Sequence, residues 1–332
     1  MKTLNALALF IPLSVAQPLI AQGLKWDTEA FAQREQIQPT RDVLPSSASL
    51  KRYAPFTHSQ YGSTCVAFSL ASARTILYAK RNGLTDKETI SANSFSPWFI
   101  YYRNRDLRDR DCSMGLDADK AITDLMNTGV QRLMKVEYGE YYPFTQHLLT
   151  NFYPPDYSED VREAQAFELA AAYRLETVDD MRFALANGMP IVIGVLPPAS
   201  FEQAIGVSVW NPTAQEQPVP ENAHALVVVG YDDSKYGGAV EVLNSWGSKW
   251  GTGGYVWVRY ADLLRFTVGA YALSDAAPAR YRKEPTAEQD PTAGDEGNAS
   301  PWRAMSDFTF KCGSPETTIS QYAGLDPRLL VK

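Results

Sequence analysis

Three cysteines and three histidines limit the nucleophilic chemistry available to this 332-residue chain. A cysteine attacks as its thiolate, and the N-terminus of a helix favours negative charge. Cys65 follows a turn at Gly62 and opens a run whose apolar residues recur at helical spacing. We therefore expect Cys65 in the first turn of a helix capped by Ser63 or Thr64. Taken alone, the same pattern also fits a small buried hydrophobic residue.

A nucleophilic cysteine needs a neighbouring base, and His224 is the best-placed histidine. It heads the apolar run HALVVVGY, which is typical of a strand that begins at a sheet edge. A surface or capping histidine is the alternative for this position. His58 lies near Cys65 in the sequence and is the rival base, whereas His147 falls in a stretch without pattern and is expected to be solvated.

A third segment, NSWGSKWGTGGYVWV at 244–258, carries a polar residue at a strand end. The side-chain amide of Asn244 can accept a hydrogen bond from one imidazole nitrogen and hold the other nitrogen toward a thiol. The tryptophans can shield that bond from water. The alternative is a glycine-rich hairpin with packed aromatic residues.

The elements around these residues differ between the two halves of the chain. Helices are expected at about 117–128, closed by Gly129, and from Thr177 to Gly188, where Asp180 completes a capping-box-like pair. After Gly188, short runs rich in Val, Ile, Tyr and Trp predict antiparallel strands: MPIVIGVL, HALVVVGY, AVEVLNSW, GYVWVRY and VGAYAL. Segregated helices and strands predict an α+β architecture, with a cleft where the halves meet.

The N-terminus predicts export. Lys2, an apolar run and a small-residue site at Ala16 indicate a signal peptide over 1–21, and hence a secreted or periplasmic protein. An uncleaved anchor and a buried N-terminal helix are the alternatives. The run is short for a bilayer and no other stretch approaches the roughly 20 apolar residues of a spanning helix, so no membrane span is expected in the mature chain.

Composition argues against several partners. The net charge of -7 is spread along the chain, which disfavours nucleic acid or an anionic membrane surface. No His/Cys cluster has metal-ligand spacing, and no phosphate-cradling glycine loop precedes a helix, so neither a metal nor another cofactor is expected. The oligomeric state stays open.

Three segments resemble the papain family of cysteine peptidases, and they occur in the family's order: CVAFS, HALVVVGYDD and NSWGSKWGTGGY. Smaller similarities lie in LPSSASLKRYAPF, SFSPWFIYYRNR and DCSMGLDADKAITDLMNTGV. The resemblance covers roughly 44–275 and implies a papain-like two-lobed fold. A helical N-terminal lobe at about 60–135 and an antiparallel β-rich C-terminal lobe at about 176–275 would then flank the active-site cleft.

The remaining boundaries follow from composition. Residues 22–43 read as an N-terminal arm, polar and with little periodicity. Residues 276–300 have the Pro-, Glu- and Ala-rich composition of a linker, and 301–332 form a C-terminal extension. The long inhibitory propeptide of some relatives is missing, so either the enzyme is made active or one of these terminal segments guards the cleft.

The resemblance also implies roles. Cys65 would be the nucleophile, His224 the general base and then acid, and Asn244 the group that orients His224, with Trp246 covering that pair. Gly115 matches a cleft glycine whose backbone pairs with the substrate. The implied activity is that of a cysteine endopeptidase, which hydrolyses peptide bonds through a thioester acyl-enzyme. A catalytically impaired binding module and a transpeptidase that uses the same acyl-enzyme remain alternatives.

The oxyanion donor is the first departure from the family pattern. The family's glutamine stands one place further from the nucleophile than Gln60 does here, so an ungapped match gives Ser59. A one-residue deletion would restore Gln60 as the donor, and we prefer that reading. Val66 stands where the family usually has a tryptophan.

The cysteines are the second departure. Gly62 stands where the family has the cysteine that pairs with the cleft-region cysteine, Cys112. Cys312 is the only other candidate partner, which implies a Cys112–Cys312 disulfide that ties down the C-terminal extension. Two free thiols are the alternative.

Overall fold

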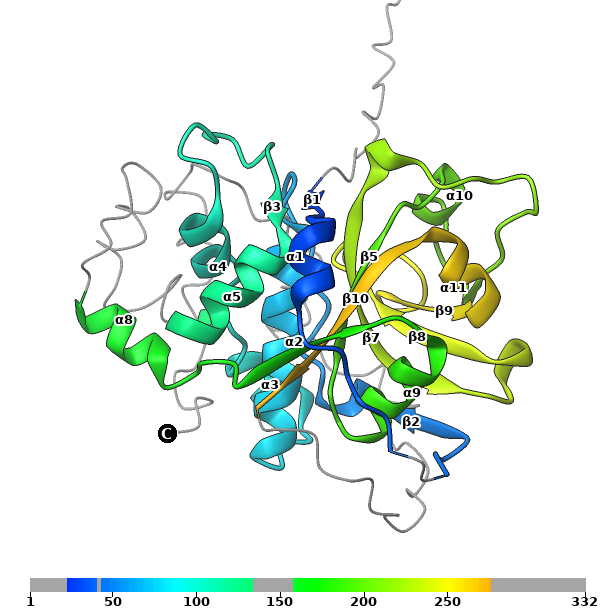
Figure 1. Cartoon of the computed structure of the whole chain (residues 1–332), viewed down its shortest axis with the longest axis horizontal. Coiled ribbons are helices and arrows are strands. Elements are labelled where there is room, and N and C mark those ends of the chain that lie inside the picture. The colour runs from blue at the N-terminus through cyan, green and yellow to red at the C-terminus, as the bar shows by residue number, and fades with distance from the viewer. Residues whose placement is uncertain (1–22, 41–42, 134–157, 276–332) are drawn as a thin grey trace, which may run out of the picture.

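The computed structural model describes residues 23–40, 43–133 and 158–275, the coloured parts of Figure 1. The predicted signal peptide, linker and C-terminal extension lie outside these residues, as does His147. The α-helices are α1 (Thr28–Gln33), α2 (Cys65–Arg81), α3 (Lys87–Ala92), α4 (Pro97–Asn104), α5 (Ala118–Thr128), α8 (Ser158–Gln165), α9 (Val178–Ala186), α10 (Ala199–Glu202) and α11 (Tyr260–Phe266). No helix of the described part is both long and apolar enough to cross a membrane.

The β-strands are β1 (Leu24–Lys25), β2 (Ser47–Ser49), β3 (Leu116–Asp117), β4 (Ala171–Leu175), β5 (Ile191–Val195), β6 (Val209–Trp210), β7 (His224–Asp232), β8 (Ala239–Leu243), β9 (Tyr255–Arg259) and β10 (Thr267–Ser274). Short 3-10 turns occur at Lys51–Tyr53, Pro220–Asn222 and Lys235–Gly237.

Helix α2 begins at Cys65, as predicted, and is buried along most of its length. A helix that is apolar nearly all round belongs in an interior, and α2 lies between the other helices and the sheet (Figure 1). Thr64 occupies the capping position, but its side chain makes no capping bond. Its Oγ1 instead donates to the carbonyl of Tyr61 at 2.8 Å, and this bond stabilises the turn that precedes Cys65.

The two other predicted helices are confirmed with their caps. The Asp117 carboxylate accepts from the Lys120 amide at the start of α5, and Gly129 closes that helix with a φ of 77°. Thr177 and Asp180 form the reciprocal capping box of α9. Both helices end where the sequence places a glycine or asparagine suited to leaving the helical conformation.

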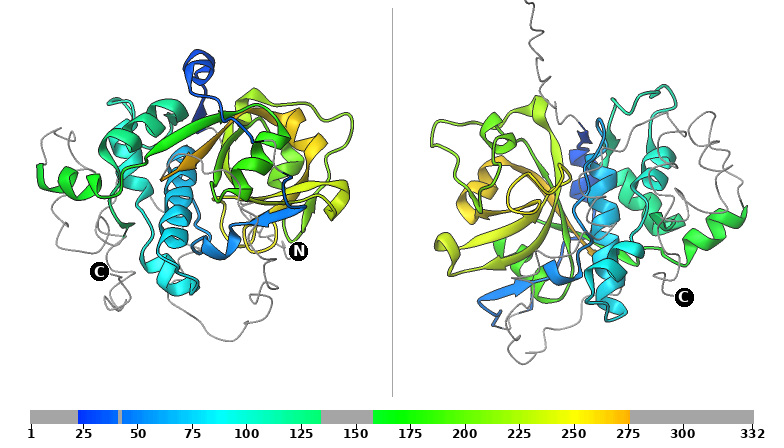
Figure 2. Two further views of the ribbon diagram at one scale, coloured as in Figure 1. Left: turned by 60° about the horizontal axis from the view of Figure 1, so that its bottom comes forward. Right: turned by 180° about the vertical axis from the view of Figure 1, so that it is seen from behind.

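The five apolar runs of the second half form β5, β7, β8, β9 and β10 of an eight-stranded sheet. Its order is β4-β10-β5-β7-β8-β9-β6, with β2 added against β7, and its pairings are antiparallel except for β6 with β9. Strand β4 starts at Ala171, a few residues before the expected lobe boundary at 176. The predicted α+β, two-lobed papain-like fold is confirmed, with helices and sheet on opposite sides of α2 (Figure 2).

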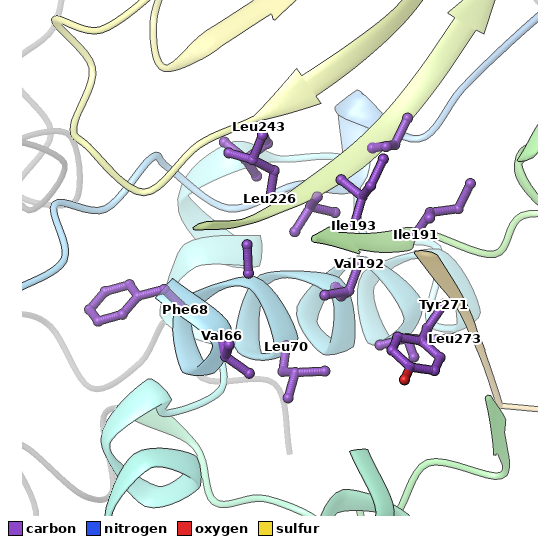
Figure 3. Close-up of a cluster of buried hydrophobic side chains, with 14 of the residues drawn as sticks. Val66, Phe68, Leu70, Ile191, Val192, Ile193, Leu226, Leu243, Tyr271 and Leu273 are labelled. Carbon is purple, nitrogen blue, oxygen red and sulfur yellow. The ribbon is translucent and has the colours of Figure 1, made fainter. Parts of the chain in front are cut away.

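The interior where the lobes meet is apolar. Val192 and Leu226 of the sheet and Val66 and Leu70 of α2 are all 2% exposed or less and belong to one continuous core (Figure 3). This packing holds the first turn of α2 close to the first residues of β7. The fold therefore brings Cys65 and His224 to the same place, although 158 positions separate them in the sequence.

The N-terminal arm is more regular than its sequence suggests. Strand β1 pairs in parallel with β3 of the helical lobe, and Asp27 caps α1 by accepting from the amides of Glu29 and Ala30. Helix α1 lies across the junction between helices and sheet (Figures 1 and 2).

The end of the arm is fixed to both lobes. Arg34 forms a half-buried ion pair with Asp119 of α5 at 2.7 Å. Arg174 of β4 donates to the carbonyl of Arg34 at 3.0 Å and accepts from the amide of Ile37 at 3.1 Å through its own carbonyl. The arm thus bridges the two lobes on the face where they meet.

Candidate active site

Cys65 is a free, fully buried cysteine at the start of α2. Its sulfur is approached by the backbone N–H groups of Ala225, Val66 and Cys65 itself, which lower the pKa of the thiol. Burial is the larger effect and raises the pKa to about 12. Because Ala225 directly follows His224, the sulfur lies beside the first residues of β7.

His224 is held by the predicted asparagine. Its Nε2 lies 2.8 Å from Oδ1 of Asn244, and both side chains are buried. The amide of Ser245 also donates to Asn244 Oδ1, at 2.7 Å, which fixes the orientation of the side-chain amide. Since Oδ1 can only accept, Nε2 carries the hydrogen of the neutral ring, and Nδ1 is left as the basic nitrogen. That Nδ1 is buried and makes no hydrogen bond in the described structure.

Trp246 covers the histidine. The two rings stack with centroids 4.5 Å apart and an interplanar angle of 24°. Burial lowers the pKa of His224 to about 4, although the Asn244 bond opposes this shift. With the thiol pKa raised and the imidazole pKa lowered, the pair is neutral in this state at pH 7.

Gln60 lies between the turn before Cys65 and the asparagine segment. Its Nε2 donates to the carbonyl of Gly62 at 2.8 Å, and its Oε1 accepts from Ser245 at 2.6 Å. Ser59 instead forms a backbone bridge with Trp246. The structure therefore brings the Gln60 amide, against the Ser59 alternative, next to the turn that leads into Cys65.

Gly62, which stands where the family has a cysteine, lies against the backbone of Cys112. Gly62 has a φ of 57°, and a Cβ there would lie 2.6 Å from the Cys112 carbonyl. That carbonyl accepts from the amide of Ser63 at 2.7 Å. Cys312 lies outside the described residues, so the Cys112–Cys312 disulfide stays a prediction.

Gly115, the predicted cleft glycine, lies against the chain's own arm. A Cβ on Gly115 would overlap the carbonyl oxygen of Gly23, and that oxygen accepts from the amide of Leu116 at 2.9 Å. On the other side, the amide of Gly23 donates to the carbonyl of Ala223 at 3.3 Å. The arm is thus hydrogen-bonded to backbone from both lobes.

Gly23 lies directly over Cys65. A Cβ placed on it would be 2.7 Å from Cys65 Sγ and 2.8 Å from the carbonyl group of Ser63. No periodicity in the arm predicts this contact. The Asp-Thr-Glu start of α1 is the one local signal in the arm, because an aspartate before an acidic first turn is typical of a helix start.

His58, the rival base, packs near Phe68, with ring centroids 6.3 Å apart, and burial lowers its pKa to about 4. The asparagine contact is made by His224. Within the described residues, no three His, Cys, Asp or Glu side chains are grouped so that they could hold a metal ion.

A cysteine at a helix N-terminus, beside a histidine whose ring is fixed by a buried amide, defines a thiol–imidazole site of the kind used in acyl transfer. The chain belongs to the papain family of cysteine proteases: the family model described as "Papain family cysteine protease" matches residues 60–268.

Solved structures support the fold. Xylellain, a cysteine protease from Xylella fastidiosa, is similar with a TM-score of 0.59 and 22% identity over 77% of this chain and 97% of that one. Digestive procathepsin L2 from the larval midgut of Tenebrio molitor gives a TM-score of 0.57 at 17% identity, over 77% and 78% of the two chains. At these identities the likeness shows the fold alone.

Among curated proteins, an uncharacterized peptidase C1-like protein of Acanthamoeba polyphaga mimivirus is 29% identical over 209 residues. The match covers 58% of this chain and 60% of that protein. The chain therefore spans less than two thirds of the relative's length.

Proposed function

We propose that this chain is a cysteine endopeptidase in which Cys65, His224 and Asn244 form the catalytic triad. The observation that carries the proposal is the buried His224–Asn244 hydrogen bond, which leaves Nδ1 of His224 as the basic nitrogen, while the Cys65 sulfur lies at the amide of the next residue, Ala225. Membership of a protease family makes a peptide the expected substrate.

The reaction follows from these positions. His224 Nδ1 takes the thiol proton while the Cys65 sulfur attacks the peptide carbonyl carbon. The imidazolium then gives that proton to the departing amine as the C–N bond breaks, which leaves a thioester on Cys65. A water molecule, deprotonated by Nδ1, attacks the thioester and releases the acid and the thiol. If an amine replaced water in the last step, the product would be a new amide.

Two donors are available for the oxyanion. The backbone N–H of Cys65 lies at the start of α2, and the Gln60 amide carries a second hydrogen beyond the one donated to Gly62. Such a donor typically contributes about 3 kcal/mol to the transition state. The position of Gln60 beside Gly62 supports it over Ser59 as this donor.

The described state is, in this proposal, a latent one. Gly23 covers the sulfur, and the arm uses backbone groups of both lobes that a bound peptide would need. The arm would therefore have to leave before a substrate enters. Of the two segments expected to guard the site, the C-terminal extension lies outside the described residues, whereas the arm lies on Cys65.

Export and the disulfide belong to the same proposal. The apolar N-terminus with Ala16 at a small-residue site supports a secreted or periplasmic enzyme. A Cys112–Cys312 disulfide is consistent with that compartment, where such bonds persist.

The test compares the full chain with Cys65→Ala on a fluorogenic peptide library under reducing conditions. The same chains are treated with an epoxysuccinyl probe, and a Gly23→Ala chain is included because its arm is expected to be loosened. Turnover and probe labelling that both disappear in Cys65→Ala would support the proposal. An unlabelled Cys65 and no turnover in the Gly23→Ala chain would refute it and favour a binding module.

A further inference from the structure

A small internal cavity borders Asn244, and His224 is not among the residues that line it. Its walls come from the segment before α2, from α2 itself, from β7 and from the end of β8. The polar side of the lining includes His58, Ser69 and Ser72 besides Asn244. The cavity has a volume of about 10 Å³, which is room for about one water molecule.

The side-chain amide of Asn244 is satisfied on one side only. Its Oδ1 accepts from Nε2 of His224 and from the amide of Ser245. Its Nδ2 is buried without a hydrogen-bond partner in the described structure, and the residue is 3% exposed. A buried polar group without a hydrogen bond is costly, so such groups are normally satisfied by protein atoms or by ordered water. The Asn244 amide therefore needs an acceptor from the cavity that it lines.

Backbone pairing fixes His58 along the asparagine segment. The carbonyl of His58 accepts from the amide of Gly247 at 3.1 Å, and the amide of Gln60 donates to the carbonyl of Ser245 at 2.7 Å. The His58 ring packs edge-on near Phe68, with centroids 6.3 Å apart, and its Nδ1 is buried. Burial lowers the pKa of His58 to about 4, so the ring is neutral at pH 7 and has one acceptor nitrogen.

We propose that His58 is a positioning residue for Asn244, acting through one water in this cavity that accepts from Asn244 Nδ2 and donates to the His58 ring. The hydroxyls of Ser69 and Ser72 border the same cavity and can complete the hydrogen bonds of the water. This bridge holds the amide so that Oδ1 faces His224. Without it, the buried donor turns toward another acceptor, and the amide loses its hold on the His224 tautomer. The inference rests on the proposed peptidase function.

The first test measures the tautomer of His224 by ¹⁵N NMR of the full-length chain labelled in histidine. The chain has three histidines, and a His224→Gln chain assigns the signal. His58→Leu removes the ring nitrogens, and it should raise the ratio of the Nδ1–H to the Nε2–H form about tenfold, the weight of one hydrogen bond. His58→Asn, whose Oδ1 can replace Nδ1 as acceptor, should restore the native ratio. Phe56→Leu changes an apolar wall of the same cavity and should leave the ratio unchanged.

Turnover gives the second readout, in chains that also carry Gly23→Ala so that the arm is loosened. His58→Leu should lower kcat about tenfold with KM within twofold, because the fault lies in the histidine and not in substrate binding. His58→Asn should recover the rate. Ser69→Val, or Ser72→Val if the first variant does not fold, fills the cavity and should reproduce the effect of His58→Leu with His58 intact.

Each result decides between positioning and packing. A native tautomer ratio in His58→Leu would overturn the proposal even if turnover fell. Equal changes in His58→Leu and His58→Asn would assign His58 to packing alone, and a native ratio in the cavity-filled chain would exclude the water bridge. A tautomer shift in chains that show no turnover would refute the peptidase function and leave the positioning role of His58 standing.

Discussion

Gly23 sets how closely the arm can approach Cys65, and adding one methyl group there should open the site. In Gly23→Ala, the new Cβ would meet Cys65 Sγ at 2.7 Å and the Ser63 carbonyl group at 2.8 Å. Real Cβ atoms do not tolerate such distances, and the Ser63 contact is with backbone, which cannot rotate away. The φ of Gly23 is not left-handed, so the substitution acts through this collision alone.

The size of the effect can be estimated. Overpacking a close contact costs about 1–3 kcal/mol, which corresponds to a rise of about 5- to 150-fold in the open population. In the closed state, burial raises the pKa of the Cys65 thiol to about 12 and covers its sulfur, so the thiol is protonated at pH 7 and shielded from reagents. Reaction with a thiol reagent therefore passes mainly through the open state and reports its population.

The assay is the second-order rate of Cys65 alkylation by iodoacetamide in the folded full-length chain. Peptide mass spectrometry separates Cys65 from Cys112 and Cys312. Lys25→Ala, which changes an exposed side chain of the same strand, is the control and should react at the native rate. Should Gly23→Ala react no faster than the native chain, the reasoning from the Gly23–Cys65 contact would be wrong.

Two further predictions concern the histidine. Asn244→Ala, made in the Gly23→Ala chain, removes the acceptor that fixes the His224 tautomer, so kcat/KM should fall by about 10²-fold or more while Cys65 is still alkylated; an unchanged kcat/KM would contradict the assigned role. The second prediction is that acid releases the arm. The pKa of His224 is about 4 in the closed state, whereas that of a solvated imidazole is about 6.5, so the closed state binds fewer protons between these two pH values. The closed state should therefore lose stability as pH falls from 6.5 toward 4. The open-to-closed ratio should rise by up to about tenfold per pH unit in that window. Hydrogen exchange of the Leu24 and Lys25 amides would measure this, and a His224→Gln chain with the same acid response would refute the assignment.

The local features of the site were predictable because short segments encode them. The turn at Gly62, the helical spacing after Cys65 and the apolar run after His224 each act within about ten residues. The caps of α5 and α9 depend on side chains three residues from the amides they accept from, and the structure confirms both. The α+β fold follows from the same patterns.

The placement of the arm and the row of small residues across β5, β7 and β10 depend on contacts that no local pattern records. Strand β1 has only two residues, and its partner lies about ninety positions further along the chain. Gly194 and Gly269 face each other only because β5 and β10 pair in one register out of several. Read singly, each glycine resembles a weak point in a strand. The sequence also left open whether Ser59 or Gln60 donates a hydrogen bond to the oxyanion. The length of the turn before a helix is not determined by the helical spacing of the residues that follow it.

In the proposed function, the arm competes with substrate as a tethered ligand, and this determines how its loosening should appear in kinetics. A segment joined by a short flexible connection has an effective concentration on the order of millimolar, so a peptide in solution displaces it poorly. Variants that weaken the arm then change the fraction of open molecules at any moment and leave the chemistry of each open molecule unchanged. A covalent probe would accordingly reach the same final labelling of Cys65 in native and Gly23→Ala chains and differ only in rate. A catalytic defect, by contrast, would lower turnover at a given extent of opening, and the two measurements together separate latency from loss of catalysis.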